Sequence, residues 1–248
     1  MLEQSIKFTE EKLNSLRHDI MKSLRLSDYQ KDICVVVTGS YGRQEASSES
    51  DIDWYIIFDK DREASVTIGS EIKIIQEHIK QIVPNEHGDT GTFGAENIAK
   101  FSEMQSNIGG DNDTNKALTR RMLFLLEGAY LYNEKAFERY RFELLKKYIK
   151  KTDSSENIPR FLLNDIIRYY RTITTDFEYK VTEKDKDWGL RNIKLKFSRK
   201  LLYFSGIVAV AQLNGLGYDQ RISKAVELFS SSPLNRIQSI ANSNEAIR

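Results

Sequence analysis

Apolar residues recur every three or four positions near the start of the chain, with charged residues between them. They are Leu13, Leu16, Ile20 and Leu24. This spacing is the period of an amphipathic helix, which we predict to end near residue 27. The next apolar run, residues 33–38, is continuous and mostly β-branched, with Lys31 and Asp32 before it and Gly39 after it. Such a run favours a buried strand over a helix.

The stretch 51–58 has a period of two and predicts a second strand. Its alternate apolar residues, expected on one face, are Ile52, Trp54, Ile56 and Phe58. Asp51 and Asp53 are therefore predicted to share the opposite face. Isoleucines at helical spacing over 68–82 then predict a helix that Pro84 ends. The glycine-containing segment 85–94 is predicted to be a loop or a short broken strand.

From about residue 111 onward the pattern is almost entirely helical. Helices are predicted around 118–126 and over 137–149, 161–180 and 190–212. The loops between them are mostly short, which suits a helical bundle. On the helix 161–180 we expect an apolar stripe of Leu163, Ile166, Tyr170, Ile173 and Phe177. The predicted fold class is α+β: a mixed sheet flanked by helices in a domain of residues 1–110, followed by a C-terminal helical bundle in a domain of residues 111–248.

Composition narrows the class of protein. Of 248 residues, 40% are hydrophobic and 29% charged, with 13 Gly and 3 Pro, which excludes a disordered or collagen-like chain. The formal net charge is +1, so any polyanion must be bound by a local patch. The single cysteine, Cys34, excludes a disulfide framework within the chain. We expect a cytoplasmic protein with no membrane span, because no uncharged apolar stretch approaches the roughly 20 residues that a span needs.

Candidate chemistry lies between the two predicted strands. The first strand ends in Gly39 and Ser40, and the second begins with Asp51 and Asp53. A glycine turn lets backbone amides approach a phosphate, and a serine hydroxyl adds a donor. Two carboxylates on one strand face are oxygen ligands suited to Mg²⁺. Each half alone has an ordinary structural explanation, since Gly-Ser turns and solvated Asp-x-Asp strand ends are common.

The two halves together resemble the active-site signature of the DNA polymerase β-type nucleotidyltransferase superfamily. Within it, residues 39–45 followed by 50–53 look most like the PII-protein uridylyltransferases and their stand-alone relatives. Residues 117–131 resemble the helix that follows the catalytic core in that group. The resemblance covers about residues 35–150. The chain is too short for the hydrolase and regulatory modules of the uridylyltransferases, so removal of the nucleotide by this chain is not expected.

The resemblance implies the roles of the site residues. Asp51 and Asp53 would bind Mg²⁺ or Mn²⁺ and act as catalytic carboxylates. Gly39 and Ser40 would hold the phosphates of a nucleoside triphosphate such as ATP, and Arg43 could reach a phosphate. The superfamily commonly adds a third carboxylate from a later strand. The candidates for it are Asp89, which we prefer, and Glu96.

The implied activity is transfer of a nucleoside monophosphate from an NTP to a hydroxyl acceptor, with release of pyrophosphate. The acceptor is unknown: a protein hydroxyl, a small molecule, a second nucleotide and an RNA 3′ end all remain open. The near-zero net charge argues against long nucleic acid as a partner. The alternative hypothesis is a catalytically silent interaction module of the same fold, such as the antitoxin partner of a toxin.

Two further groups of cations deserve a structural interpretation. Arg120 and Arg121 interrupt an apolar helix, and we predict that one faces a cleft between the domains while the other lies on the surface. A denser basic set consists of Arg191, Lys194, Lys196, Arg199 and Lys200. It could steer a triphosphate or an RNA end, but the default expectation for it is a solvated helix face.

Overall fold

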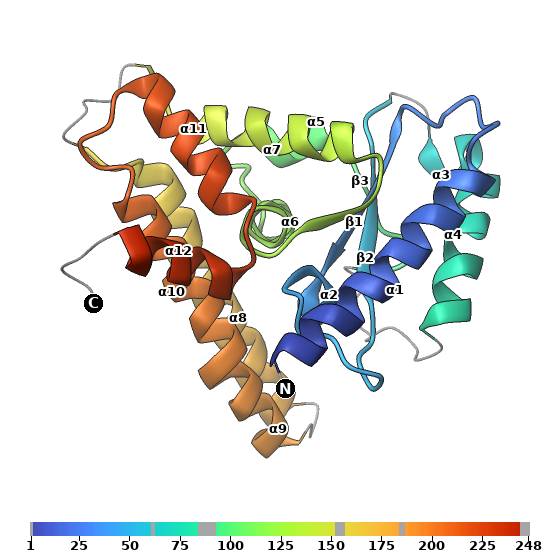
Figure 1. Ribbon diagram of the computed structural model, residues 1–248. Coiled ribbons are helices and arrows are strands. Elements are labelled where there is room, and N and C mark those ends of the chain that lie inside the picture. Colours follow the sequence, from blue (N-terminus) through green and yellow to red (C-terminus); the bar gives the residue numbers. More distant parts are fainter. Residues whose placement is uncertain (1, 61–62, 84–92, 152–156, 184–186, 244–248) are drawn as a thin grey trace. The chain divides into compact units, whose positions relative to one another are not determined.

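The computed structural model describes most of the chain (Figure 1). The described ranges are residues 2–60, 63–83, 93–151, 157–183 and 187–243. Contacts divide the chain into two compact units, residues 1–104 with 127–141 and residues 105–126 with 142–248. The chain therefore crosses from one unit to the other three times. The division at residues 110 and 111 stays a prediction, and each unit is described separately below.

A mixed four-stranded sheet forms the centre of the first unit, in the order β3-β2-β1-β4. Its strands are β1 Ile33–Thr38, β2 Asp53–Phe58, β3 Ile98–Ala99 and β4 Ala129–Tyr132. Strand β1 pairs antiparallel with β2 and with β4, and β2 pairs parallel with β3. Together with the flanking helices and the helical second unit, this sheet confirms the predicted α+β class.

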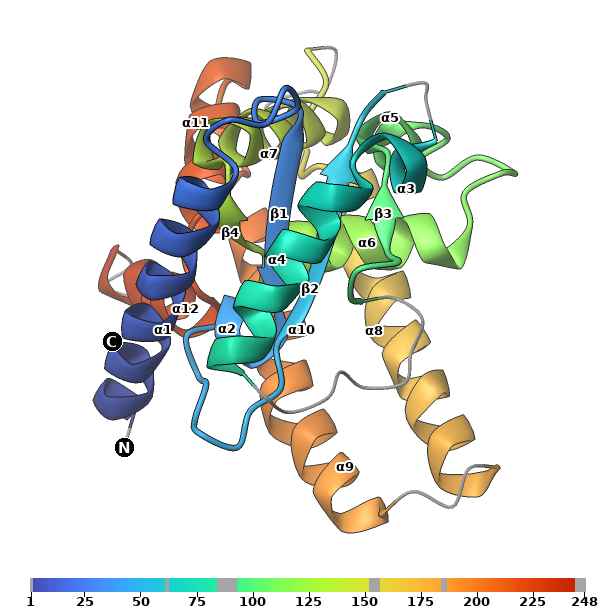
Figure 2. The ribbon, with the colours of Figure 1, turned by 90° about the vertical axis from the view of Figure 1, so that its right-hand side faces the viewer.

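Helices α1 (Leu2–Ser23) and α4 (Gly69–Ile82) lie side by side against one face of the sheet, as Figure 2 shows. The four apolar residues predicted on one face of the second strand are all in the core between these layers, and so are the four predicted for the first helix. Trp54 is fully buried there. The periods of 2 and 3.6 thus placed this core correctly. The remaining short helices of the unit are α2 Gly39–Gly42, α3 Ala64–Thr67 and α5 Phe101–Gln105.

The expectation of one helix over 117–131 is wrong. Helix α6 spans Asn115–Leu126, and the chain then turns at Gly128 into β4. Arg141 donates a hydrogen bond from Nη2 to the Gly128 carbonyl, 3.0 Å away, while β4 pairs with β1. Tertiary pairing therefore ends the helix, because residues 129–132 complete the second side of β1. The two-residue strand β3 was not predicted either.

The second unit is helical, as predicted for the C-terminal region. Besides α6, its helices are α7 Glu134–Tyr148 (whose first half belongs to the first unit), α8 Arg160–Thr182, α9 Trp188–Lys194, the π-helical turn η1 Leu195–Arg199, α10 Lys200–Ala211, α11 Tyr218–Phe229 and α12 Pro233–Ser243. Helices α9, η1 and α10 are continuous and run opposite to α8, and η1 and α10 pack against α8 (Figure 2). Within the described residues, no helix has the length and hydropathy to cross a membrane.

The side chain of Arg236 fixes helices of the second unit to one another. It is fully buried on α12 and donates hydrogen bonds to the Leu228 and Leu126 carbonyls, at 2.9 and 3.0 Å, and to Ser205 Oγ at 2.9 Å. These acceptors lie on α11, α6 and α10. Arg236 therefore supplies side-chain hydrogen bonds to carbonyls at the C-terminal ends of α11 and α6.

Candidate active site

Antiparallel pairing of β1 and β2 brings together the two halves of the predicted motif. In a hairpin of this kind the end of the first strand lies opposite the start of the second, and here Thr38 pairs with Asp53. Thr38 Oγ1 also donates a hydrogen bond to the Asp53 carbonyl oxygen, 3.4 Å away. The turn that follows Thr38 is consequently adjacent to the first residue of β2.

Gly39 allows the Asp53 carboxylate to lie directly against this turn. A Cβ at position 39 would be 2.5 Å from Asp53 Oδ2, closer than side-chain contacts permit. The φ angle of Gly39 is +65°, a conformation that residues with a side chain rarely adopt. Ser40 follows in α2, and its hydroxyl has no hydrogen-bond partner within the described part of the chain. The turn therefore offers a hydrogen-bond donor, the Ser40 hydroxyl, next to the residue that contacts the Asp53 carboxylate.

Asp51 lies just before β2 and is exposed, whereas Ile52 is fully buried in the core. The alternation thus leaves both Asp51 and Asp53 outside that core. Burial raises the pKa of the Tyr41 phenol, and the negative charge of Asp51 raises it further, which places Asp51 near α2. A shared orientation of the two carboxylates stays a prediction.

The donor set of Asp51 and Asp53 fits a Mg²⁺ or Mn²⁺ ion. Both supply carboxylate oxygens, and Mg²⁺ is usually held by one or two carboxylates together with substrate phosphates and water. The residues that the structure describes contain no group of three or more potential metal ligands. Of the candidates for a third carboxylate, Asp89 lies outside the described residues, and Glu96 is exposed two residues before β3.

Arg43, predicted to reach a phosphate, is held by two carboxylates. Its Nε is 2.9 Å from Glu45 Oε2, its Nη1 contacts Glu127 Oε2, and its side chain is only 9% exposed. Burial disfavours the charged guanidinium, but Glu127 and Glu45 more than offset this and raise the pKa of Arg43. Gly42 lets the turn touch the Glu127 carbonyl, which a Cβ would meet. Arg43 thus ties the turn to the segment before β4, and phosphate binding by Arg43 stays a prediction.

Comparison with known proteins adds one observation to this geometry. Residues 20–101 match the family model of the nucleotidyltransferase domain. The match begins within α1, ends at the start of α5 and includes β1, the Gly39 turn and β2. The match to this family model supports nucleotidyl transfer as the general activity. Among curated proteins, none matches the chain significantly.

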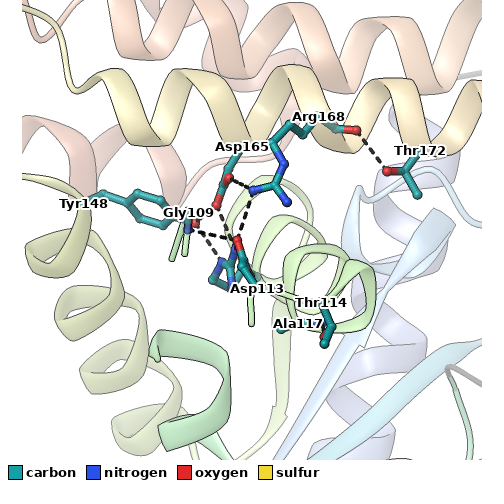
Figure 3. Close-up of polar contacts among 9 residues, drawn as sticks. Gly109, Asp113, Thr114, Ala117, Tyr148, Asp165, Arg168 and Thr172 are labelled. Atoms are coloured by element: carbon teal, nitrogen blue, oxygen red, sulfur yellow. Dashed lines mark hydrogen bonds and ion pairs between the residues drawn. The ribbon is translucent and has the colours of Figure 1, made fainter. Parts of the chain in front are cut away.

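Sequence reasoning missed a buried ionic cluster in the second unit (Figure 3). Asp113 Oδ2 accepts three hydrogen bonds: from Arg121 Nη2 at 2.8 Å, from Arg168 Nη1 at 3.0 Å and from the Gly109 amide at 3.0 Å. Burial alone would raise the pKa of Asp113, but the hydrogen bonds from Arg121, Gly109 and Arg168 lower it. The loop before α6 is therefore held to α6 and α8 by charge.

Asp165 on α8 completes this cluster. Its carboxylate accepts hydrogen bonds from Tyr148 Oη at 2.6 Å, from Arg121 at 2.9 Å and from Arg168 at 2.9 Å. The prediction that one of Arg120 and Arg121 lies on the surface is wrong, since both are buried. The available signal was the pair of arginines within an apolar helix, because buried cations require carboxylate partners.

Proposed function

We propose that this chain is a metal-dependent nucleotidyltransferase that moves a nucleoside monophosphate from an NTP, such as ATP, to a hydroxyl acceptor. The observation that carries the proposal is the contact of the Asp53 carboxylate with the Gly39 turn, within the segment that matches the nucleotidyltransferase domain. Nucleotidyl transfer requires hydrogen-bond donors for the phosphates and, close to them, carboxylates that bind the metal ion.

The chain's own residues would act by binding and orientation. Ser40 Oγ and the amides of the turn would donate hydrogen bonds to the triphosphate. Asp51 and Asp53 would hold Mg²⁺ or Mn²⁺, with Asp89, or Glu96 in its place, as a third carboxylate. Bound Mg²⁺ supplies charge neutralisation for the phosphates and the leaving pyrophosphate.

The proposed reaction is a single displacement at phosphorus. The acceptor hydroxyl oxygen forms a bond to the α-phosphorus, and the bond from that phosphorus to the bridging oxygen breaks. The electron pair of this bond leaves with pyrophosphate, and the hydroxyl proton passes to a carboxylate or to water. Positioning and electrostatics account for most of the catalysis in such reactions. Resemblance to PII-protein uridylyltransferases favours a protein hydroxyl as the acceptor.

Label transfer tests this proposal. The purified chain is incubated with each of the NTPs radiolabelled at the α-phosphate, with Mg²⁺ or Mn²⁺, in the presence and absence of cell lysate. Label in a protein, RNA or small-molecule fraction identifies the acceptor class. Absence of both product and metal-dependent NTP binding would contradict the proposal and favour the silent interaction module.

Substitution of the carboxylates tests the site itself. Asp51→Asn and Asp53→Asn should each lower turnover by about a hundredfold or more, because each removes charge that would hold the ion. The exposed Asp28, replaced by Asn, serves as the matched control and should retain activity. Unchanged circular dichroism separates loss of chemistry from loss of fold. Full activity of the double variant would refute the metal assignment.

A further inference from the structure

The helix formed by α9, η1 and α10 exposes large apolar side chains, of which Ile193, Phe197 and Phe204 lie along one side. The exposed fractions are 58% for Trp188, 59% for Ile193, 70% for Phe197 and 51% for Phe204. The opposite side of α10 is buried in the helical unit, through residues such as Leu202 and Ala209. These four side chains therefore lie outside the buried core of the unit. Contiguous exposed apolar surface of this kind usually marks an interaction site.

Exposed lysines lie among these apolar residues. Lys196, Lys200 and Phe204 follow one another at intervals of four, and Ile193 and Phe197 do the same one position away. Residues four apart are neighbours on a helix surface, so cations and aromatic rings alternate on the same side. Lys194 is also exposed, and residues 187–200 contain five basic residues against one acid, Asp187. The π-helical turn η1 lies in the middle of this stretch, and π-turns occur frequently at functional sites.

We propose that this surface, defined by Ile193, Lys196, Phe197, Lys200 and Phe204 and called the aromatic-basic face, binds single-stranded RNA. Sites for single strands combine cations that follow the phosphates with aromatic rings on which bases stack. The chain as a whole has a net charge of only +1, so the excess of basic residues over 187–200 is a local feature of the sequence. From Ile193 to Phe204 the helix extends about 16 Å, enough for a site of a few nucleotides.

Two other occupants fit the pattern less well. Protein–protein interfaces are depleted in lysine, whereas lysine is dense here. A helix lying in a membrane surface separates an apolar face from a charged one. On the aromatic-basic face, Lys196 and Lys200 alternate with Ile193, Phe197 and Phe204 along the helix, so the cationic and apolar groups do not form two separate faces. Charge complementarity with a polyanion that carries bases is the better match.

Binding of RNA does not depend on the proposed function. If both hold, an RNA 3′ hydroxyl would be one class of acceptor for nucleotidyl transfer. RNA binding would then replace the expectation that the basic residues of 191–200 are only solvated. That expectation did not take the exposed aromatic side chains into account. The near-zero net charge remains an argument against long, sequence-independent wrapping of nucleic acid.

Intrinsic fluorescence provides a direct probe. The chain has two tryptophans, and Trp54 is fully buried in the core of the first unit while Trp188 is exposed. Titration of the full chain with an oligouridine of about twelve nucleotides should quench the Trp188 emission saturably, because Trp188 begins the same helix and the bound strand lies close to its indole. The logarithm of the dissociation constant should rise with the logarithm of the salt concentration. A slope of about 3 is expected, because each of about four neutralised phosphates contributes about 0.7.

A pair of double variants tests the location. Phe197→Ala with Lys200→Glu should weaken binding of fluorescein-labelled oligouridine by about tenfold or more in an anisotropy titration. Phe142→Ala with Lys147→Glu makes the same change of composition at exposed positions of α7 and should leave the affinity within about twofold of the original value, since ordinary surface changes are small. Asp53→Asn should bind RNA normally, which separates this proposal from the catalytic one.

Four results would overturn the proposal. They are absence of saturable quenching, an equal loss of affinity in the α7 variant, quenching of Trp188 by phosphatidylserine vesicles but not by RNA, and a concentration-dependent dimer that the Phe197→Ala, Lys200→Glu variant abolishes in the absence of RNA binding. The third result would indicate a lipid surface and the fourth a second copy of the chain.

Discussion

Gly39 and Asp53 are in such close contact that the Asp53 carboxylate occupies the space where a side chain at position 39 would lie. A Cβ at position 39 would be 2.5 Å from Asp53 Oδ2, and the φ angle of +65° independently requires glycine. The turn after β1 and the acidic start of β2 therefore form one structural unit. A change in the turn displaces the carboxylate even when Asp53 itself is unchanged.

Gly39→Ala should impair activity more than it impairs folding. The left-handed backbone costs about 1–2 kcal/mol for a residue with a side chain. Displacement of the Asp53 carboxylate should lower nucleotidyl transfer by about a hundredfold, as misplacement by about 1 Å can do. Urea unfolding and label transfer measure the two effects. Gly69→Ala is the control, because a Cβ at position 69 meets nothing within 4 Å; equal activity of both variants would contradict the interpretation.

Glu127→Gln should destabilise the first unit. Arg43 and Glu127 are buried, with side chains 9% and 1% exposed, so loss of one charge leaves the other poorly compensated. The expected decrease in the free energy of unfolding is about 3 kcal/mol, measured by urea denaturation. Glu11→Gln, which removes the exposed partner of Lys7, should change stability by less than about 0.5 kcal/mol.

The same Glu127→Gln variant tests the predicted role of Arg43 in phosphate binding. If Arg43 acts only as a tie to Glu127, NTP affinity at a temperature where the variant is folded should be unchanged. Tighter NTP binding by the variant would show instead that the released guanidinium can bind phosphate. Equilibrium binding of a fluorescent NTP analogue distinguishes these outcomes.

Asp113→Asn should destabilise the second unit in a manner that depends on pH. Hydrogen bonds from Arg121, Gly109 and Arg168 outweigh burial and lower the folded-state pKa of Asp113 below its usual 3.8. The stabilisation is therefore fully present above about pH 4 and is lost as the pH falls through the folded-state pKa. Urea unfolding should show a difference of about 3 kcal/mol from the unaltered chain near neutral pH. This difference should shrink in acid, and a constant difference would refute the linkage.

Cys34 should resist thiol reagents in the native protein. It lies fully buried in β1, and burial raises the pKa of its thiol well above the usual range, so the reactive thiolate is scarce. Because it is the single cysteine, iodoacetamide labelling measured by mass spectrometry should appear only with unfolding of the first unit. Rapid labelling without denaturant would contradict the packing of β1.

Strong local periodicity was enough to predict β1, β2, α1 and α4, because burial of a single face fixes such patterns. It failed at residues 129–132, where an apolar run continues from α6 and pairing with β1 decides the conformation. For α8, part of the predicted apolar stripe is shifted by one residue. The structure buries Leu162, Ile166 and Tyr169, with Asp165 among them, rather than Leu163 and Tyr170.

In the candidate site too, contacts between residues that are near in sequence could be predicted, and contacts between distant residues could not. The Gly-Ser turn and the two aspartates are close in sequence, so their juxtaposition follows from a hairpin. Glu127, the partner of Arg43, is 84 residues away, and Asp165 is 44 residues from Arg121. No local pattern indicates such pairs. The exposure of Phe197 was equally invisible, because an apolar residue at helical spacing is normally assigned to the interior.

The late position of β4 in the chain limits how the protein can be shortened. A truncated chain that stops near residue 110 would lack residues 129–132 and leave one side of β1 open, with its amides and carbonyls exposed. An unprotected apolar strand of this kind tends to recruit a neighbouring molecule. Such a fragment should aggregate during expression, whereas a version in which a short linker joins residue 104 to residue 127 and the chain ends after residue 141 would retain every strand of the sheet.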